Sequence, residues 1–266
     1  MQIRNLWPYR WLLLNFLSRE IKSRYVGSVS GIFWALLHPL ALLAVYAVVF
    51  TAIFKVKFPE LEGHSFILFV AVALWPWLCF QEGTQRGALA VQNGGGLIKK
   101  VAFPHELLVY GAVLSTYAVH VVGFLLVLAV LAFTGNELYF SSLPLVLLLL
   151  CMQLLLTSGL ALILAALQVL LKDVEHFLTP LFMIWFYATP VLYPASLVPQ
   201  QIQQIIALNP LSFFITRIRE LLMTGNSQIG WQDMVMLTGS LLIFFAGRWF
   251  FNRLSPYFED LFSPYD

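Results

Sequence analysis

Long apolar runs, separated by short polar stretches, dominate this 266-residue chain. A hydrocarbon core about 30 Å thick takes about 20 apolar residues of helix to cross. Six runs reach or approach that length, at residues 32–54, 64–82, 107–133, 143–171, 177–193 and 231–251. The runs are continuously apolar rather than alternating, which predicts helices and not the strands of a membrane barrel. We therefore expect an all-α, polytopic membrane protein with six transmembrane helices, in one transmembrane domain covering residues 1–266.

The composition agrees with lipid as the surrounding solvent. Hydrophobic residues make up 60% of the chain and charged residues only 11%, against about 25% charged residues in soluble domains. Both cysteines, Cys79 and Cys151, fall inside apolar runs, where we expect small buried side chains rather than disulfides. The N-terminal segment is basic but has no apolar stretch ending in a small-residue cleavage site, so no cleavable signal peptide is predicted.

Lysine and arginine are unevenly distributed between the polar stretches. If the N-terminus is cytoplasmic, most basic residues fall on the cytoplasmic side, including those of residues 1–25, 81–106 and 172–176. The opposite side then receives only Lys55, Lys57, Arg217 and Arg219. By the positive-inside rule, we predict that both termini are cytoplasmic.

Residues 10–25 form the first segment of interest outside the runs. Leu14, Leu17, Ile21 and Tyr25 recur at steps of three and four, with basic and polar residues elsewhere around the turn. This pattern predicts an amphipathic helix that lies in the membrane interface. Such a helix either anchors the chain on anionic headgroups or contacts a cytoplasmic partner.

Two further cytoplasmic segments carry charge. In residues 81–106, the glycines at 94–96 are predicted to end a short helix over 84–92. This segment lacks the Gly-x-x-x-x-Gly-Lys-Ser/Thr pattern of a phosphate-binding loop, so we predict no nucleotide site in the chain. The cluster at residues 172–176 either solvates helix ends or docks a partner.

Residues 196–225, between the fifth and sixth runs, are too apolar for a free loop and too broken to span. We expect two short helices, hinged at Asn209-Pro210, that form a re-entrant hairpin in the outer leaflet. Arg217 and Glu220 stand three residues apart and can pair on one helix, which we interpret as a structural contact.

The sequence has no recognisable pattern for catalysis or metal binding. Its five histidines lack metal-ligand spacing, and its acidic residues are not paired in one run. Ion-coupled transporters keep carboxylates inside their spans, whereas His120 is the one titratable residue that we place at a run centre. We interpret His120 as a packed core residue, and predict no catalytic residue, metal or cofactor in this chain.

Aromatic side chains concentrate instead in the first and fifth runs. Flat apolar faces with polar edges suit stacking against sugar rings without fixing one register, although they also suit interfacial belts or packing. The candidates for lining a substrate channel are Trp34, Tyr46, Phe50, Trp185, Phe186 and Tyr187.

Several short motifs occur together in a distinctive order. They are REIKSRY at residues 19–25 with Trp34 and Pro39, LIKKV at 97–101, KDVEH at 172–176, and WFYATP at 185–190 followed by Asn209-Pro210. In this order, over nearly the whole chain, they resemble the polysaccharide and polyol-phosphate exporter branch of the ABC-2 permeases.

The resemblance implies a homodimer in the bacterial inner membrane that binds two copies of a separate ATPase. ATP and Mg would be held by that ATPase, and the dimer would export a polyprenyl-diphosphate-linked polysaccharide, such as O antigen, from cytoplasm to periplasm. The lipid-linked glycan and membrane lipids are the implied partners, and nucleic acid is not.

The resemblance also implies residue roles. The interface helix and the cytoplasmic loops would couple to the ATPase, through the candidates Arg86, Lys99, Lys100, Lys172, Asp173, Glu175 and His176. The first and fifth spans would border the channel. A lipid diphosphate would be attracted to Arg19, Lys22 and Arg24, because phosphate forms charge-assisted hydrogen bonds with basic side chains.

Other functions stay open at this point. Within the same family, the substrate is alternatively a capsular polysaccharide or a teichoic acid. A membrane glycosyltransferase would also be aromatic and polytopic but should cluster acidic residues at one membrane face. A secondary transporter is disfavoured by the lack of carboxylates within the predicted spans.

Overall fold

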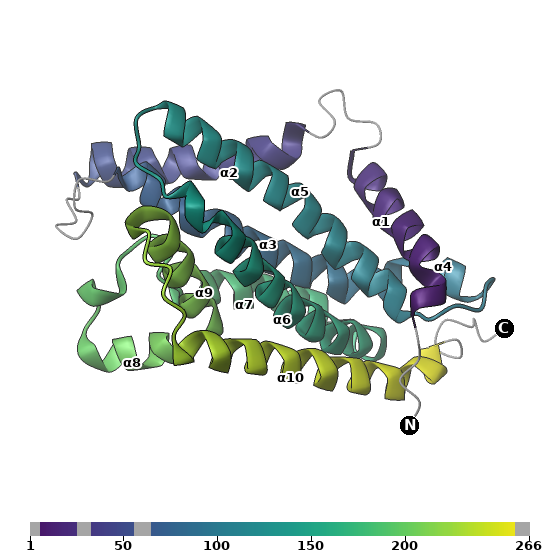
Figure 1. Ribbon diagram of the computed structural model, residues 1–266. Coiled ribbons are helices and arrows are strands. Elements are labelled where there is room, and N and C mark those ends of the chain that lie inside the picture. The colour runs from purple at the N-terminus through teal and green to yellow at the C-terminus, as the bar shows by residue number, and fades with distance from the viewer. Residues whose placement is uncertain (1–5, 26–32, 56–64, 259–266) are drawn as a thin grey trace.

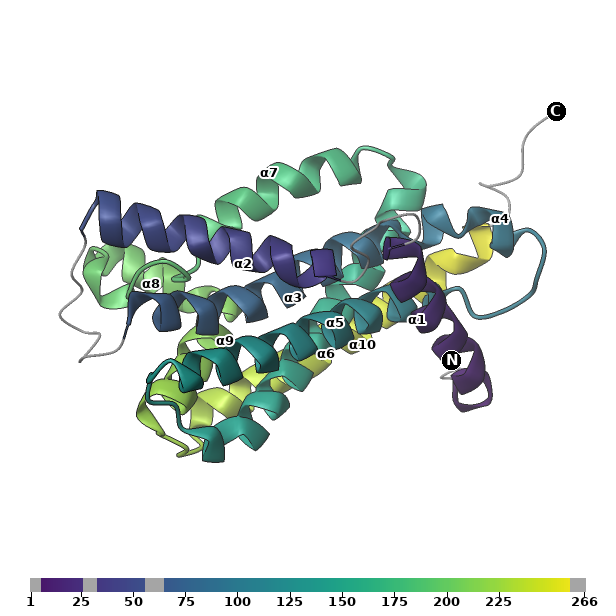
Figure 2. The ribbon, with the colours of Figure 1, turned by 90° about the horizontal axis from the view of Figure 1, so that it is seen from above.

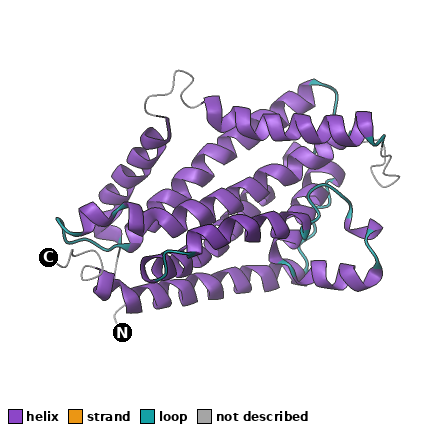
Figure 3. Cartoon of the chain, turned by 180° about the vertical axis from the view of Figure 1, so that it is seen from behind, coloured by secondary structure: helices purple, strands orange, loops and turns teal. Residues whose placement is uncertain are grey.

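The computed structural model describes residues 6–25, 33–55 and 65–258, and within these residues every regular element is a helix (Figure 3). Five helices are long and apolar enough to cross a membrane. They are α2 (Phe33–Ala47) with its π-helical continuation η2 (Val48–Ile53), α3 (Phe66–Asn93), α5 (Glu106–Phe133), α6 (Leu143–Leu170) and α10 (Trp231–Leu254).

The shorter elements lie between and around these five helices. They are η1 (Trp7–Tyr9), α1 (Arg10–Tyr25), α4 (Gly95–Ile98), η4 (Phe140–Ser142), α7 (Val174–Tyr187), η5 (Ala195–Leu197), α8 (Gln200–Leu208), α9 (Pro210–Arg219), η6 (Glu220–Thr224) and η7 (Ser255–Tyr257). Helices α1 and α4 lie at one end of the bundle and α8 at the other, with the long helices running between them (Figure 1). We call these the α1 end and the α8 end.

Helix α3 is the centre of the bundle. Its most apolar window is 83% buried, against 11% for α2 and 17% for α10. Large side chains such as Trp75, Trp77 and Phe80 are fully buried on it, and it packs against α5, α6 and α9. Other helices therefore cover most of the apolar surface of α3, whereas most of the apolar surface of α2 and α10 is left uncovered by protein.

The prediction of a separate short helix over residues 84–92 is wrong, because α3 continues without a break from Phe66 to Asn93. Its second half stays packed between α5 and α6 where glycines allow close approach. A Cβ at Gly87 would lie 2.6 Å from Cβ of Ala161. The predicted break at the following glycines is found, since Gly94 is the C-cap of α3.

Helix α6 crosses α10 with direct backbone contact. A Cβ at Gly247 would lie 2.2 Å from the carbonyl oxygen of Gly159, and a Cβ at Gly159 would lie 2.5 Å from the carbonyl oxygen of Ile243. Small residues at a crossing allow the dense packing that stabilises helix pairs in lipid. At the α1 end, the ion pair from Arg248 Nε to Glu106 Oε2 (2.9 Å) ties α10 to the first turn of α5.

Helix α1 occupies residues 10–25, the range expected for the interface helix. Phe16 is buried against α5, where Gly111 admits it, and its ring lies 5.4 Å from that of Phe103. Leu14, on the predicted apolar face, is 51% exposed. Leu17 and Ile21 of the same face are half-buried, so this face stays at least partly uncovered by protein, while Phe16 makes the contact with α5 from another side of the helix.

Helix α7 ends at Tyr187, well before residue 193, where the fifth run was expected to end. A helix of 14 residues is about 21 Å long, which is short of a hydrocarbon core about 30 Å thick. Pro190 lacks an N–H and disfavours helical geometry at the preceding residue, so the chain turns over residues 188–192. Figure 2 shows α7 beside α2, separate from the tightly packed long helices.

Candidate functional site

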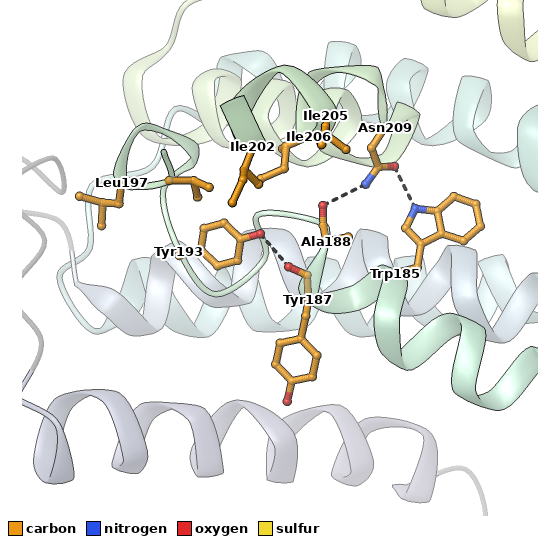
Figure 4. Close-up of a pocket in the computed structure, with 10 residues that line it drawn as sticks. Trp185, Tyr187, Ala188, Tyr193, Leu197, Ile202, Ile205, Ile206 and Asn209 are labelled. Carbon is orange, nitrogen blue, oxygen red and sulfur yellow. Dashed lines mark hydrogen bonds between the residues drawn. The ribbon is translucent and has the colours of Figure 1, made fainter. Parts of the chain in front are cut away.

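A cavity of about 500 Å³ lies at the α8 end, between the C-terminal end of α7 and α8 (Figure 4). Its wall is mostly aromatic and aliphatic, with Asn209 as a polar residue. Trp185 and Tyr193 bring their rings from the α7 side, and Ile202 and Ile205 come from α8. The Tyr193 hydroxyl donates to the Tyr187 carbonyl oxygen (2.7 Å), which holds the chain leaving α7 in place.

Asn209 organises this region because it bonds to three segments. Its Oδ1 accepts hydrogen bonds from the Trp185 indole N–H (2.9 Å) and from the Leu211 backbone N–H (3.0 Å), and the second bond caps α9. Its Nδ2 donates to Thr189 Oγ1 (2.8 Å). The Asn209-Pro210 hinge expected from the sequence is thus also the polar junction of α7, α8 and α9.

The predicted channel aromatics form a seam along α2 and α7. Tyr46 stacks on Phe186 with ring centroids 5.9 Å apart, and Phe50 stacks on Phe66 at 5.3 Å. Trp185 meets Phe80 of α3 edge to face at 5.1 Å.

Exposure along this seam is uneven. Phe186 is buried, whereas Tyr187 is 61% exposed, and its ring points away from α8 in Figure 4. Trp34 lies apart from the seam, in a second cavity at the α1 end.

Arg219 is buried, and among the described residues it has no carboxylate partner. Its Nε donates to the Phe69 carbonyl oxygen of α3 (3.1 Å), and its two terminal nitrogens donate to the carbonyl oxygens of Pro190 and Val191. The guanidinium also lies 3.5 Å from the centre of the Phe69 ring. A single cation thereby fastens the turn after α7 to α3 and α9.

The Arg217–Glu220 pair expected from the sequence is present, with Nη1 and Oε2 2.9 Å apart. Arg217 also pairs with Asp233 of α10 through Nε (3.3 Å) and donates to the carbonyl oxygens of Asn226 and Gln228. The pair thus belongs to a larger cluster that connects α9 to the start of α10.

A charged cluster centred on Glu82 lies toward the α1 end. Glu82 Oε1 accepts from Arg86 Nε (2.6 Å) and lies 3.4 Å from Arg24 Nη1, while Oε2 lies 2.6 Å from Nε2 of His120. Arg86 also reaches Glu20 at 3.5 Å. Three helices, α1, α3 and α5, meet in this cluster. It was not predicted from the sequence, because Glu82 was expected at the very end of the second span, whereas α3 continues to Asn93.

The three basic residues predicted to attract a lipid diphosphate fall into two environments. Arg19 and Lys22 are exposed on α1. The side chain of Arg24 is only 3% exposed, because it reaches inward to Glu82 and to the hydroxyls of Ser115 and Thr116 on α5. The spacing of Glu82 and Arg86, four apart on one helix, was the available signal for this arrangement.

The predicted coupling residues are also divided. Lys99, Lys100, Lys172, Asp173, Glu175 and His176 are exposed. Gln168 of α6 holds the loop at residues 172–175 in place, because its side-chain amide donates to the Lys172 carbonyl oxygen (3.2 Å) and accepts from the Glu175 N–H (2.8 Å). The same amide donates to Gln92 of α3 (2.6 Å). Arg86, by contrast, belongs to the Glu82 cluster.

Residues 12–223 match the ABC-2 type transporter family. The chain belongs to this family. This ABC-2 chain is therefore the membrane subunit of a transporter, and it is a multi-pass membrane protein.

Relatives of this ABC-2 chain are similar over most of their length. An O-antigen export system permease protein RfbA from Myxococcus xanthus is 34% identical over 80% of this chain and 81% of that protein. A protein of the same name from Klebsiella pneumoniae is 27% identical over 94% of both chains. A polysialic acid transport protein KpsM from Escherichia coli is 23% identical over 86% of this chain and 88% of that protein.

Proposed function

We propose that this chain is the channel-forming permease subunit of an ATP-driven exporter that moves polyprenyl-diphosphate-linked polysaccharide of the O-antigen type from cytoplasm to periplasm. The similarity to O-antigen export permeases, which extends over 94% of the chain, carries this proposal. The more distant similarity to KpsM supports capsular polysaccharide as the second candidate substrate.

The proposed topology has six crossings in the bacterial inner membrane, with both termini cytoplasmic. Helix α6 ends at the α1 end of the bundle, and α8 lies at the opposite end (Figures 1 and 2). The segment between them, α7 with the turn at 188–193, therefore carries the chain across and counts as the fifth crossing. Helices α8 and α9 then form the re-entrant hairpin. The exposed lysines at the α1 end support a cytoplasmic location for that end.

The proposed assembly is a homodimer with two copies of an ATPase that holds ATP and Mg. The exposed residues at Lys99, Lys100 and 172–176 are suited to dock the ATPase, and Gln168 would pass their displacement to α3 and α6. The seam from Tyr46 to Tyr187 would line the channel, because its aromatic rings lie side by side along α2 and α7 and Tyr187 is 61% exposed. Arg19 and Lys22 would attract the diphosphate, with Arg24 adding charge behind them.

A deletion strain tests this function. Cells that lack the chain should retain lipid-linked polysaccharide on the cytoplasmic side and show none at the surface, and expression of the intact chain should restore it. The tagged chain, purified in mild detergent, should carry an ATPase in equal number. Normal surface polysaccharide in the deletion strain, or a chain without an ATPase in a preparation shown to keep its subunits, would contradict the proposal.

A further inference from the structure

A cavity of about 580 Å³ lies between α2, α3 and α5 at the level of the Glu82 cluster. Trp34 and His38 line it from α2, and Gln85 and Arg86 line it from α3. Trp34 is 53% exposed, so the cavity reaches the molecular surface on its α2 side. None of the roles assigned so far uses this space as a whole.

The two guanidinium groups in the wall of the cavity are already paired with carboxylates. Arg24 and Arg86 of the wall both pair with Glu82, and Arg86 also pairs with Glu20, which lies outside the wall. An anion placed here would meet carboxylates as well as guanidinium groups, and it would displace hydrogen bonds that are already made. The walls therefore favour a neutral ligand over a phosphate group.

The remaining polar groups of the wall suit hydroxyl groups. In the described part of the chain, Gln85, His38 and the Trp34 indole N–H have no hydrogen-bond partner. Gln81, also in the wall, accepts from the Trp77 indole N–H (2.8 Å) through Oε1, which leaves its amide N–H groups for other partners. Amide, imidazole and indole groups beside one flat aromatic face match a sugar ring, which offers hydroxyls at its edge and C–H groups on its faces.

The depth of the cavity fits the lipid-proximal sugar of a membrane-anchored glycan. Glu82 lies 16 residues beyond Phe66, or about 24 Å along α3, close to the inner boundary of a core about 30 Å thick. Arg86 also lines a smaller cavity of about 150 Å³ that includes Arg19 of α1. A sugar in the larger cavity would thus leave its diphosphate near the exposed basic residues of α1.

We propose that this α2–α3–α5 cavity binds the neutral sugar closest to the diphosphate of the lipid-linked glycan, with Trp34 stacking on the ring and Gln85 and His38 bonding its hydroxyls. The proposal rests on the function proposed above, and it assigns recognition of the first sugar to this chain rather than to its ATPase. It also separates sugar recognition from diphosphate attraction.

Binding of two lipids to the purified, intact transporter tests the proposal. One is a polyprenyl diphosphate that carries a single hexose, and the other is the same lipid without the sugar. Native mass spectrometry of the lipid adducts gives their relative affinities. We expect the wild type to bind the hexose-bearing lipid about tenfold more tightly, a difference of about 1.4 kcal/mol.

Substitutions in the wall should remove this preference and leave binding of the sugar-free lipid unchanged. Trp34→Leu and Gln85→Leu should each bring the two affinities to within about twofold, while Trp34→Phe should retain most of the preference. Trp249→Leu and Gln232→Leu, which change the same residue types on the exposed surface of α10, serve as matched controls and should behave as wild type. Thermal unfolding in detergent identifies the variants that fold.

The outcomes distinguish this proposal from the proposed function. Unchanged preference in folded Trp34→Leu and Gln85→Leu, or a wild type without preference, overturns the sugar site even if cells still require the chain for export. If the variants lose affinity for both lipids to the same extent, the cavity binds the diphosphate, and the sugar assignment is overturned. If the wild-type protein binds neither lipid, and cells that lack the chain still export the polysaccharide, both proposals are overturned.

Discussion

Single residues decide how the polar groups inside this bundle are satisfied. Arg219 donates to carbonyl oxygens of α3 and of the turn after α7, and Glu82 joins α1 and α5 to α3. Neither role was predictable, because counting basic residues placed Arg219 in the outer polar region, and hydropathy ended the second span near Glu82. Side-chain length lets both reach partners more than 25 residues away in sequence, where local patterns carry no information.

Arg219→Lys should lower the free energy of unfolding by about 3 kcal/mol. An ammonium is a point charge and cannot match the planar fork that serves three carbonyl oxygens, and each buried group left without a partner costs about 1–3 kcal/mol. Denaturant titration of the detergent-solubilised protein measures the change. The exposed Arg253→Lys variant, whose charge lies near the Trp249 ring, should differ little from wild type. Equal stability of the two variants would show that the Arg219 contacts contribute nothing.

At the scale of elements, hydropathy predicted the existence of helices more accurately than their ends. The expected 107–133 and 143–171 runs correspond closely to α5 and α6, since continuous apolar sequence leaves only helix as a stable structure in lipid. The continuity of α3 could not be predicted, because it depends on small residues that pack against α5 and α6. The early end of α7 had a local signal in Pro190, which hydropathy ignores because the run stays apolar to Tyr193.

The site was predictable to a similar extent. Chemistry of residue types identified the aromatic groups of the first and fifth runs, and the structure places Tyr46 against Phe186. It did not identify the cavity that brings Trp34, Arg24 and Arg86 together, because these residues come from three helices. Their proximity depends on how α1 and α2 pack against α3, which no local pattern specifies.

Gly247→Ala should separate α6 from α10 and lower the free energy of unfolding by about 2 kcal/mol or more, because overpacking a close crossing forces the backbones apart. Its new Cβ would lie 2.2 Å from the Gly159 carbonyl oxygen. Gly239→Ala in the same helix is the control, since a Cβ there meets nothing within 4 Å. That substitution should be neutral or stabilise by up to about 1 kcal/mol through helix propensity. Similar unfolding curves for the two variants would contradict the described crossing.

On the scale of the whole molecule, the two ends of the bundle differ in chemistry. The α1 end carries exposed lysines and the charged loop at 172–176, whereas the α8 end carries the aromatic cavity and the Asn209 junction. This polarity fits a transporter that meets a nucleotide-driven partner on one side and releases a glycan on the other. The uncovered faces of α2 and α7 leave room for lipid or for the second copy of the proposed homodimer.

Cysteine labelling should reveal the proposed orientation. In a background without Cys79 and Cys151, Gln201→Cys at the α8 end should react with a membrane-impermeant maleimide in intact spheroplasts. Lys99→Cys at the α1 end should react only after the membrane is permeabilised. Both positions are exposed, so reactivity reports the side of the membrane rather than burial. The reverse pattern would invert the topology and remove the cytoplasmic docking surface.

The glycine crossing of α6 and α10 also has a mechanical consequence. At this crossing the backbones of α6 and α10 are in direct contact. No side chain lies between them that could change rotamer to allow sliding or rotation, so the two helices move as one stiff unit. With α3 and α5 packed on the same unit, compliance must reside in the loosely held α2 and α7. A polymer of varying bulk would therefore be accommodated by the two walls that carry the aromatic seam, while the rest of the subunit acts as a rigid frame.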